Sequence, residues 1–389
     1  MSTRFTRAVI AGSSALGAGL LVPLLGMMPA LAATPHIGTI RPGHMIWNAV
    51  HSDVTPAQAA RAAATTGSFR QFTATANSGG TSYTYVMAGK KPSKKVTNPS
   101  STIKFELVPL IMKFSNGDTW DPTQADSCDS GASPLTRVQN SPLIVKQNWT
   151  WGGTSIGNAQ VTDAFQRAEF WKYTSPTGIN PSYNVNLSWT TASPITINVP
   201  DADAADGAIG CGNGLLGAAD FSWLGSDLQS TVIPSLGIGP STVPIFLLHN
   251  FVEYQGTTAT CCTLGYHSAY STSAGVQTYG VGMYDNSGAF SGSADISALS
   301  HEVAEWQNDP YGTNPTPSWG NIGQVSGCQG NLEVGDPLSG TTFTDTVGGF
   351  TYHPQELAFS SWFYHQSPSL GVNGWYSDQG TFQAPAAAC

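Results

Sequence analysis

Three residues within five positions, His301, Glu302 and Glu305, have the side chains and the spacing needed to hold a metal ion. In an α-helix, residues four apart lie one turn apart on the same face, so His301 and Glu305 would point into the same space. Imidazole nitrogen and carboxylate oxygen both bind zinc, and an oxygen-rich site also suits manganese. Glu302 lies beside them, where it would take a proton from a metal-bound water without binding the metal. The pattern predicts a hydrolytic site with one divalent cation, and we expect zinc.

An amphipathic helix from Asp295 to about Asn308 is expected to position these residues. Its apolar residues recur at spacings of three, four and three and form one stripe, made by Ile296, Leu299, Val303 and Trp306. Asp295 precedes the stripe and is predicted to be the N-cap. The helical repeat places His301 and Glu305 on the side opposite the stripe.

The string from His301 to Glu305 is similar to the H-E-x-x-H motif of zinc peptidases, with glutamate in place of the second histidine. Glu333 and Asp336 lie downstream, and this order resembles the gluzincin metallopeptidases. In that family, a glutamate from a later helix completes the metal site and a nearby aspartate orients the first histidine. The resemblance implies that Glu333 is the third ligand and that Asp336 hydrogen-bonds to His301. The spacing here is E-x-x-D, where the family has E-x-x-x-D.

The region from Asp295 to Leu338 also resembles the exordium or phosphate-induced proteins of plants and related secreted bacterial proteins. The shared blocks are S-H-E-x-x-E, which begins at Ser300, and E-x-G-D, which begins at Glu333. This resemblance implies an extracellular location and a shared metal-like site rather than proteolysis.

Two other enzyme classes fit the same residues less well. Metzincins take their third ligand ten residues after the first histidine, but Tyr311 occupies that position and Asp309 falls two residues early. A glycosidase would need paired carboxylates such as Glu302 and Glu333. That second class is kept as a minor alternative.

The other histidines have different expected roles. His353 follows the proposed third ligand and is a candidate for stabilising the oxyanion of a tetrahedral intermediate. His249 and His267 lie among apolar or small residues and are interpreted as core histidines. The segment Val276–Tyr284 precedes the motif helix, where a zincin has the edge strand that binds an extended substrate, and an ordinary sheet strand is the alternative interpretation.

The amino terminus has the features of a secretory signal peptide. Arg4 and Arg7 precede an apolar run, and the small-residue triplet that begins at Ala30 follows it. Cleavage near Ala32 or Ala33 would release a secreted, extracellular protein without a membrane anchor. The formal net charge of −9 would become more negative by the loss of the two arginines.

The composition agrees with export. Six cysteines predict up to three disulfide bonds, whose connectivity the sequence leaves open. The acidic balance and the lack of a long basic stripe argue against nucleic acid as a partner. The expected partner is therefore an extracellular protein or peptide substrate.

The predicted fold is α+β, with a β-rich amino-terminal half packed on a zincin-like carboxy-terminal half that contains the active-site helix. The predicted divisions are a signal peptide at 1–33, an amino-terminal extension at 34–80, a β-rich region at 81–200 and a zincin-like catalytic region at 201–389. We expect a secreted metal-dependent hydrolase, specifically a zinc endopeptidase. The rival hypothesis is a non-catalytic extracellular or cell-wall binding protein that keeps a metal-like site.

Overall fold

The computed structural model describes residues 37–41, 52–64, 67–93, 99–129 and 131–389. Contacts divide the chain into Met1–Thr34 and Pro35–Cys389, and all described residues belong to the second unit. The predicted signal peptide at 1–33 lies outside the described residues.

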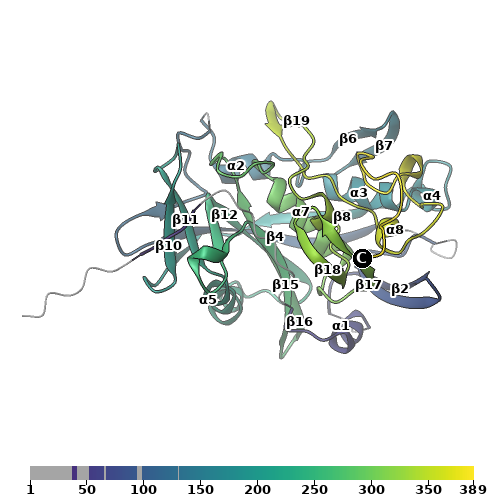
Figure 1. The fold of residues 1–389 in the computed structure, drawn as a ribbon, viewed down its shortest axis with the longest axis horizontal. Coiled ribbons are helices and arrows are strands. Elements are labelled where there is room, and N and C mark those ends of the chain that lie inside the picture. Colours follow the sequence, from purple (N-terminus) through teal and green to yellow (C-terminus); the bar gives the residue numbers. More distant parts are fainter. Residues whose placement is uncertain (1–36, 42–51, 65–66, 94–98, 130) are drawn as a thin grey trace, which may run out of the picture. The chain divides into compact units, whose positions relative to one another are not determined.

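The main sheet has seven strands in the order β15, β16, β12, β4 and β5, with β8 and β9 also paired to β4 (Figure 1). Its strands are β4 (Ser101–Lys113), β5 (Thr119–Trp120), β8 (Val185–Thr191), β9 (Ile195–Asn198), β12 (Thr242–His249), β15 (Gly265–Thr272) and β16 (Gly275–Tyr284). Strands β8, β4, β12 and β16 are parallel neighbours, whereas β15 is antiparallel to β16. Parallel strands are usually covered on both faces, which fits the apolar runs in β4 and β12.

The remaining strands form a second sheet and four hairpins. The second sheet contains β1 (Gly38–Thr39), β10 (Ala204–Ala208), β11 (Leu215–Asp220), β13 (Phe251–Tyr254) and β14 (Cys261–Thr263). The hairpins are β2 (Gln71–Ser78) with β3 (Thr81–Ala88), β6 (Gln147–Trp151) with β7 (Thr154–Ala159), β17 (Pro315–Ile322) with β18 (Val325–Asn331), and β19 (Asp345–Val347) with β20 (Phe350–Tyr352).

The helices are mostly short. They are α1 (Pro56–Ala63), α2 (Pro134–Gln139), α3 (Val161–Glu169), α4 (Trp171–Thr174), α5 (Phe221–Asp227), α6 (Ile233–Ser235), α7 (Ser297–Asn308) and α8 (Ser360–Phe363). A π-helical turn at Leu228–Val232 joins α5 to α6, and short 3-10 turns occur at Thr258–Thr260, Asp336–Leu338 and Val372–Gly374.

Helix α7 is buried along its whole length, so both its apolar and its polar side face protein. It packs on β15 and β16 and also contacts β3 and α3. On the apolar side, the ring of Trp306 meets Phe105 of β4 edge-on, with centroids 5.0 Å apart. The indole nitrogen of Trp306 donates a hydrogen bond to Thr278 of β16 at 2.9 Å. These contacts fix the rotation of α7 and therefore the direction of its polar side chains.

The predicted α+β class is confirmed: the fold is strand-rich and contains a curled half-barrel sheet. Strands β4 and β8 from region 81–200 share this sheet with β12, β15 and β16 from region 201–389. The β2–β3 hairpin crosses the predicted division at residue 80.

Two local features separate the structure from the sequence patterns. Of the two interpretations of Val276–Tyr284, the ordinary sheet strand is confirmed and the edge strand is wrong, because β16 pairs with β12 on one side and β15 on the other. The edge position belongs to β15. The segment from 318 to 330 has the Gly- and Ser-rich composition of a loop, yet it lies within the β17–β18 hairpin. Burial of Trp319 in the core stabilises this hairpin despite its weak strand composition.

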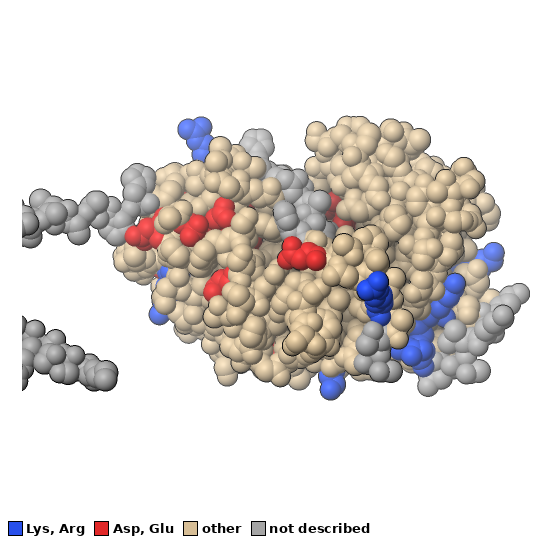
Figure 2. Space-filling view, turned by 90° about the horizontal axis from the view of Figure 1, so that it is seen from below, with Lys and Arg blue, Asp and Glu red and all other residues tan. Residues whose placement is uncertain are grey.

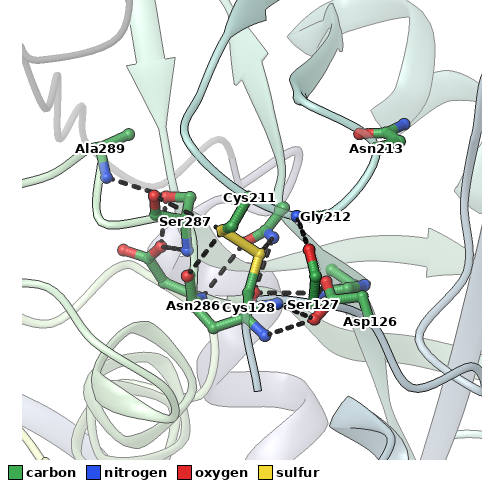
Figure 3. The surroundings of a disulfide bond; sticks show 12 residues. Asp126, Ser127, Cys128, Cys211, Gly212, Asn213, Asn286, Ser287 and Ala289 are labelled. Carbon is green, nitrogen blue, oxygen red and sulfur yellow. Dashed lines mark hydrogen bonds and ion pairs between the residues drawn. A yellow bond between two sulfur atoms is a disulfide. The ribbon is translucent and has the colours of Figure 1, made fainter. Parts of the chain in front are cut away.

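Three disulfide bonds join Cys128 to Cys211, Cys261 to Cys262, and Cys328 to Cys389, which confirms the predicted number. Figure 3 shows the first bond among polar side chains, where the Asn286 amide donates a hydrogen bond to Asp126 at 3.3 Å. Several disulfides in one chain indicate an oxidising, extracellular type of environment.

Among the described residues, no helix is both long enough and apolar enough to cross a membrane.

Candidate metal centre

Charged residues are scarce in this protein, and uncharged side chains make up most of the face in Figure 2. Four acidic side chains nevertheless lie buried in and beside α7: Glu302, Glu305, Glu333 and Asp336. Two buried histidines, His267 and His301, lie among them. Burial of so many ionisable groups costs free energy unless the groups compensate one another or bind a cation.

Two glycines permit the close packing around these side chains. A Cβ atom at Gly265 of β15 would lie 2.8 Å from Cγ of Glu302. A Cβ atom at Gly335 would lie 2.4 Å from Nδ1 of His301. Because glycine has no Cβ atom, β15 and the segment after β18 can approach α7 closely and enclose its polar side. A larger residue at either position would force a movement.

His301 faces three carboxylates through its Nε2 atom. That atom lies 3.1 Å from Oε1 of Glu305, 3.5 Å from Oδ1 of Asp336 and 3.9 Å from Oε1 of Glu302. His301, Glu305 and Asp336 form one group of buried side chains that could hold a metal ion.

His267 of β15 faces the same two glutamates from the opposite side. Its Nδ1 atom lies 3.4 Å from Oε2 of Glu302 and 3.6 Å from Oε2 of Glu305. His267, Glu302 and Glu305 form a second group with the spacing of metal ligands.

Outer hydrogen bonds set the tautomers of both histidines. The Gln355 amide nitrogen donates to the carbonyl of Gly335 at 2.6 Å, so its oxygen faces Nδ1 of His301 at 3.1 Å. Nδ1 of His301 is therefore the donor. Nε2 of His267 lies 3.0 Å from the carbonyl of Asp309 and donates to it. In each neutral histidine, the nitrogen that faces the carboxylates then presents a lone pair, as metal-binding histidines do.

Further contacts orient the carboxylates. The backbone N–H of Gly335 donates to Oε1 of Glu305 at 2.9 Å. Asp336 accepts hydrogen bonds from the side chains of Gln324 and Gln329. The Asn331 amide donates to Oε1 of Glu333 at 2.7 Å. The carboxyl group of Glu333 also interacts with that of Glu305.

The pKa shifts reflect burial together with the charges of the neighbouring side chains. Burial alone would lower the pKa of His301, but the carboxylates of Glu305 and Glu302 outweigh it and hold the pKa well above its ordinary value. Burial raises the pKa of Asp336 to about 6, with a further contribution from Glu305. Burial, then the charges of Glu305 and Asp336, raises the pKa of Glu333 well above its ordinary range. The cluster therefore favours any bound positive charge.

The residues predicted from sequence are only partly brought together as expected. His301, Glu302 and Glu305 lie side by side on α7, and Asp336 reaches His301 directly. Glu333 is buried nearby but belongs to neither group of ligand atoms. The roles of ligand and supporting residue for Glu333 and Asp336 stay predictions.

His353 lies outside both groups and pairs with Asp295, whose Oδ2 is 2.6 Å from its Nδ1 atom. This contact raises the pKa of His353. The prediction that Asp295 is the N-cap of the helix is wrong, because Ile296 has that position and makes no side-chain cap. The Asp295 carboxylate instead accepts hydrogen bonds from the backbone of Ile296 and His353.

His267 is the residue that the sequence interpretation missed. It had been assigned to the core, and it is indeed buried, but its ring faces Glu302 and Glu305. Its contact with α7 arises because β15 pairs with β16 and α7 packs on both strands. No helical or strand periodicity links residue 267 to residue 301, so local sequence patterns contain no signal for this contact.

No family model, curated protein or solved structure matches this chain. The functional argument therefore depends on the chemistry of the cluster.

Proposed function

We propose that this protein is a secreted metal-dependent hydrolase that uses the buried cluster on α7, and that its substrate is a peptide bond. The observation that supports the proposal is the spacing between histidine nitrogens and carboxylate oxygens. These distances run from 3.1 to 3.9 Å within the cluster. Charge-assisted N–H···O hydrogen bonds are shorter, at about 2.7–2.9 Å.

The other buried or half-buried histidine pairs provide an internal comparison. Nδ1 of His353 is 2.6 Å from Asp295, and Nε2 of His249 is 3.0 Å from Asp126. Two ligands of one tetrahedral zinc ion, each bound at about 2.1 Å, lie about 3.4 Å apart. The four longer distances in the cluster fit ligands around a shared cation, whereas the shortest, 3.1 Å from His301 to Glu305, has the length of a hydrogen bond, as does the 3.0 Å distance from His249 to Asp126. What distinguishes the cluster is that two histidine nitrogens and three carboxylates converge in it.

His301, Glu305 and Asp336 would hold the ion, with zinc or manganese suited to one nitrogen and several oxygens. A bound ion supplies Lewis acidity, which polarises a carbonyl group and acidifies water. Glu302 adjoins this group, and its Oε1 atom lies 3.9 Å from Nε2 of His301. Glu302 accepts the proton of the attacking water and returns it to the leaving amine. His267 holds Glu302 in position from β15.

The zincin-like arrangement is part of the same proposal. Strand β15 ends the seven-stranded sheet and lies against α7, which is the position of the edge strand in a zincin. Export of the protein would bring it to extracellular protein substrates.

The test combines metal analysis with a general protein-digestion assay on the purified mature protein. We expect bound zinc or manganese and digestion that a chelator abolishes. Glu302→Gln should keep the ion at His301 and lower activity by roughly 100-fold or more, which is the contribution of a general base. Glu106→Gln on β4 is the matched control, because Glu106 is half-buried and lies outside both ligand groups. Full activity in Glu302→Gln, or a wild-type protein without metal, would refute the proposal.

A non-catalytic binding protein is the second candidate, and the burial of the cluster favours it. Side chains of His301, Glu302 and Glu305 are only 1–4% exposed. A structural metal site is coordinatively closed, whereas a catalytic site keeps a position open to substrate. Metal that stabilises the fold in a protein without hydrolytic activity would support this candidate.

A further inference from the structure

The two groups of candidate ligands share Glu305, and the two oxygens of this carboxylate point to different histidines. Oε1 lies 3.1 Å from His301, and Oε2 lies 3.6 Å from His267. Glu302 repeats the arrangement, with Oε1 directed at His301 and Oε2 at His267. Both glutamates therefore span the space between the two histidines.

We propose that the cluster binds two divalent cations, one held by His301 and Asp336 and the other by His267 and Glu302, with the carboxylate of Glu305 bridging them. The inference builds on the proposed function and adds a second metal site to it. Each subsite contains one imidazole nitrogen and at least two carboxylate oxygens, a donor set that suits zinc and manganese.

The charge of the cluster supports two ions rather than one. Four carboxylates, those of Glu302, Glu305, Glu333 and Asp336, lie together with two histidines. Among the described residues, Glu302, Glu305 and Asp336 form their ion pairs with His267 and His301 rather than with Lys or Arg. Three of these carboxylates belong to the ligand groups, and a further buried carboxylate, that of Asp309, acts on His267. One divalent cation therefore leaves a net negative charge in a buried site, which a second cation offsets.

The hydrogen bonds that surround the ligands also support two separate metal sites. Each histidine donates its far N–H to a fixed acceptor, Gln355 for His301 and the Asp309 carbonyl for His267. Fixing the tautomer through such an acceptor is typical of metal-ligating histidines. Because each histidine has its own acceptor and faces the shared glutamates from its own side, each can bind a separate ion.

Two adjacent ions would divide the catalytic work of the proposed hydrolase between them. In two-metal sites with ions about 3.5–4 Å apart, one ion activates the attacking oxygen while the other stabilises charge on the substrate. Glu302 can bind the second ion through Oε2 while Oε1 remains directed at the His301 subsite for proton transfer.

The test is the number of metal ions per chain, measured without reference to activity. Chelator first removes any metal from the purified mature protein, which is then loaded with Zn²⁺ or Mn²⁺ and freed of excess metal. Elemental mass spectrometry measures the number of bound ions per chain. We expect two ions in the wild type and one in His267→Ala. His249→Ala should retain two, because His249 is a buried histidine that pairs with Asp126 outside both groups. One ion in the wild type, or two in His267→Ala, would overturn the inference.

Anomalous diffraction from zinc-loaded wild-type crystals decides the question even where a variant fails to fold. Two peaks about 3.5–4 Å apart, one at each histidine, are expected. A single peak refutes the second site, and chelator-sensitive hydrolysis by that one-metal protein would still uphold the proposed function. Conversely, two peaks in a protein without hydrolytic activity would uphold the sites and refute the catalysis.

Discussion

At the scale of single residues, the cluster depends on which atom of each side chain is directed inward. Gln355 holds His301 through Nδ1, so Nε2 is left to face Glu305 and Asp336. A histidine with the opposite tautomer would present an N–H to the carboxylates and could not bind a cation there. The candidate metal site is therefore defined by hydrogen bonds one layer outside the ligands.

Asp336 and Glu333 can be separated by paired substitutions. Because Asp336 lies 3.5 Å from Nε2 of His301 while Glu333 belongs to neither group, Asp336→Asn should weaken metal binding far more than Glu333→Gln. We expect a loss of more than about 100-fold for the first and about 10-fold for the second, as for a ligand and an outer-shell partner. Competition titration with a zinc-binding dye measures both affinities. The reverse order would identify Glu333 as the ligand, as the gluzincin resemblance implies.

At the scale of secondary structure, α7 is unusual because its polar side is as buried as its apolar side. The helix packs on β15 and β16, and the segment after β18 closes over its polar side. The elements that contact α7 therefore supply residues to both the hydrophobic core and the cluster. A change in how they pack on α7 should therefore affect metal binding.

Gly265→Ala tests the close approach of β15 to α7. The added Cβ would lie 2.8 Å from Cγ of Glu302 and 2.9 Å from the carbonyl oxygen of Val281, so Glu302 must move. We expect the free energy of unfolding to fall by about 1–3 kcal/mol, as for other overpacked sites, together with weaker metal binding. Denaturant unfolding and metal titration measure the two effects. Gly239→Ala is the control, because no atom lies within 4 Å of its added Cβ. Equal behaviour of the two variants would contradict the packing argument.

Helix α3 contains a buried carboxyl group that should make stability depend on pH. Glu169 is fully buried and accepts a hydrogen bond from the backbone of Ser360 at 2.6 Å. Burial raises its pKa from 4.5 to about 7. The folded protein therefore binds the proton more tightly than the unfolded chain, so this group lowers stability as pH rises from about 4.5 to 7.

Glu169→Gln removes this titration while keeping the acceptor for Ser360. The variant should match the wild type near pH 4.5 and be more stable than the wild type above pH 7. Urea unfolding at both pH values measures the difference. A constant difference between the two proteins across this range would show that Glu169 does not titrate there.

At the scale of the whole molecule, disulfide bonds close long segments of the chain. Cys128–Cys211 and Cys328–Cys389 join residues 83 and 61 positions apart, whereas Cys261 and Cys262 are adjacent. A cross-link restricts the unfolded chain more when the loop it closes is longer. The two long-range bonds should therefore contribute most of the disulfide stabilisation.

Replacing both cysteines of the Cys128–Cys211 pair with serine should lower the free energy of unfolding by roughly 2–5 kcal/mol. The bond between Cys261 and Cys262 closes almost no loop. Replacing both of these cysteines should therefore lower the free energy of unfolding much less. Denaturant unfolding under non-reducing conditions compares the two proteins. Equal losses would show that packing around the sulfur atoms, rather than loop closure, dominates.

The sequence by itself determined the local part of this architecture. The 3.6-residue repeat of Leu299, Val303 and Trp306 located α7, and the same repeat placed His301 and Glu305 together. Six cysteines in a chain with a predicted export signal indicated the disulfides. These features depend on residues that are close in sequence, because the regular backbone of a helix fixes how such residues lie relative to one another.

Only the tertiary structure decided which distant residues meet α7. His267 arrives through the pairing of β15 with β16, Gln355 lies 54 positions from His301, and Asp336 reaches His301 from the segment after β18. The predicted N-cap at Asp295 was wrong, and the order of Glu333 and Asp336 stays a prediction that depends on the gluzincin resemblance. Long-range pairing and core packing determine such contacts, and local periodicity does not encode them.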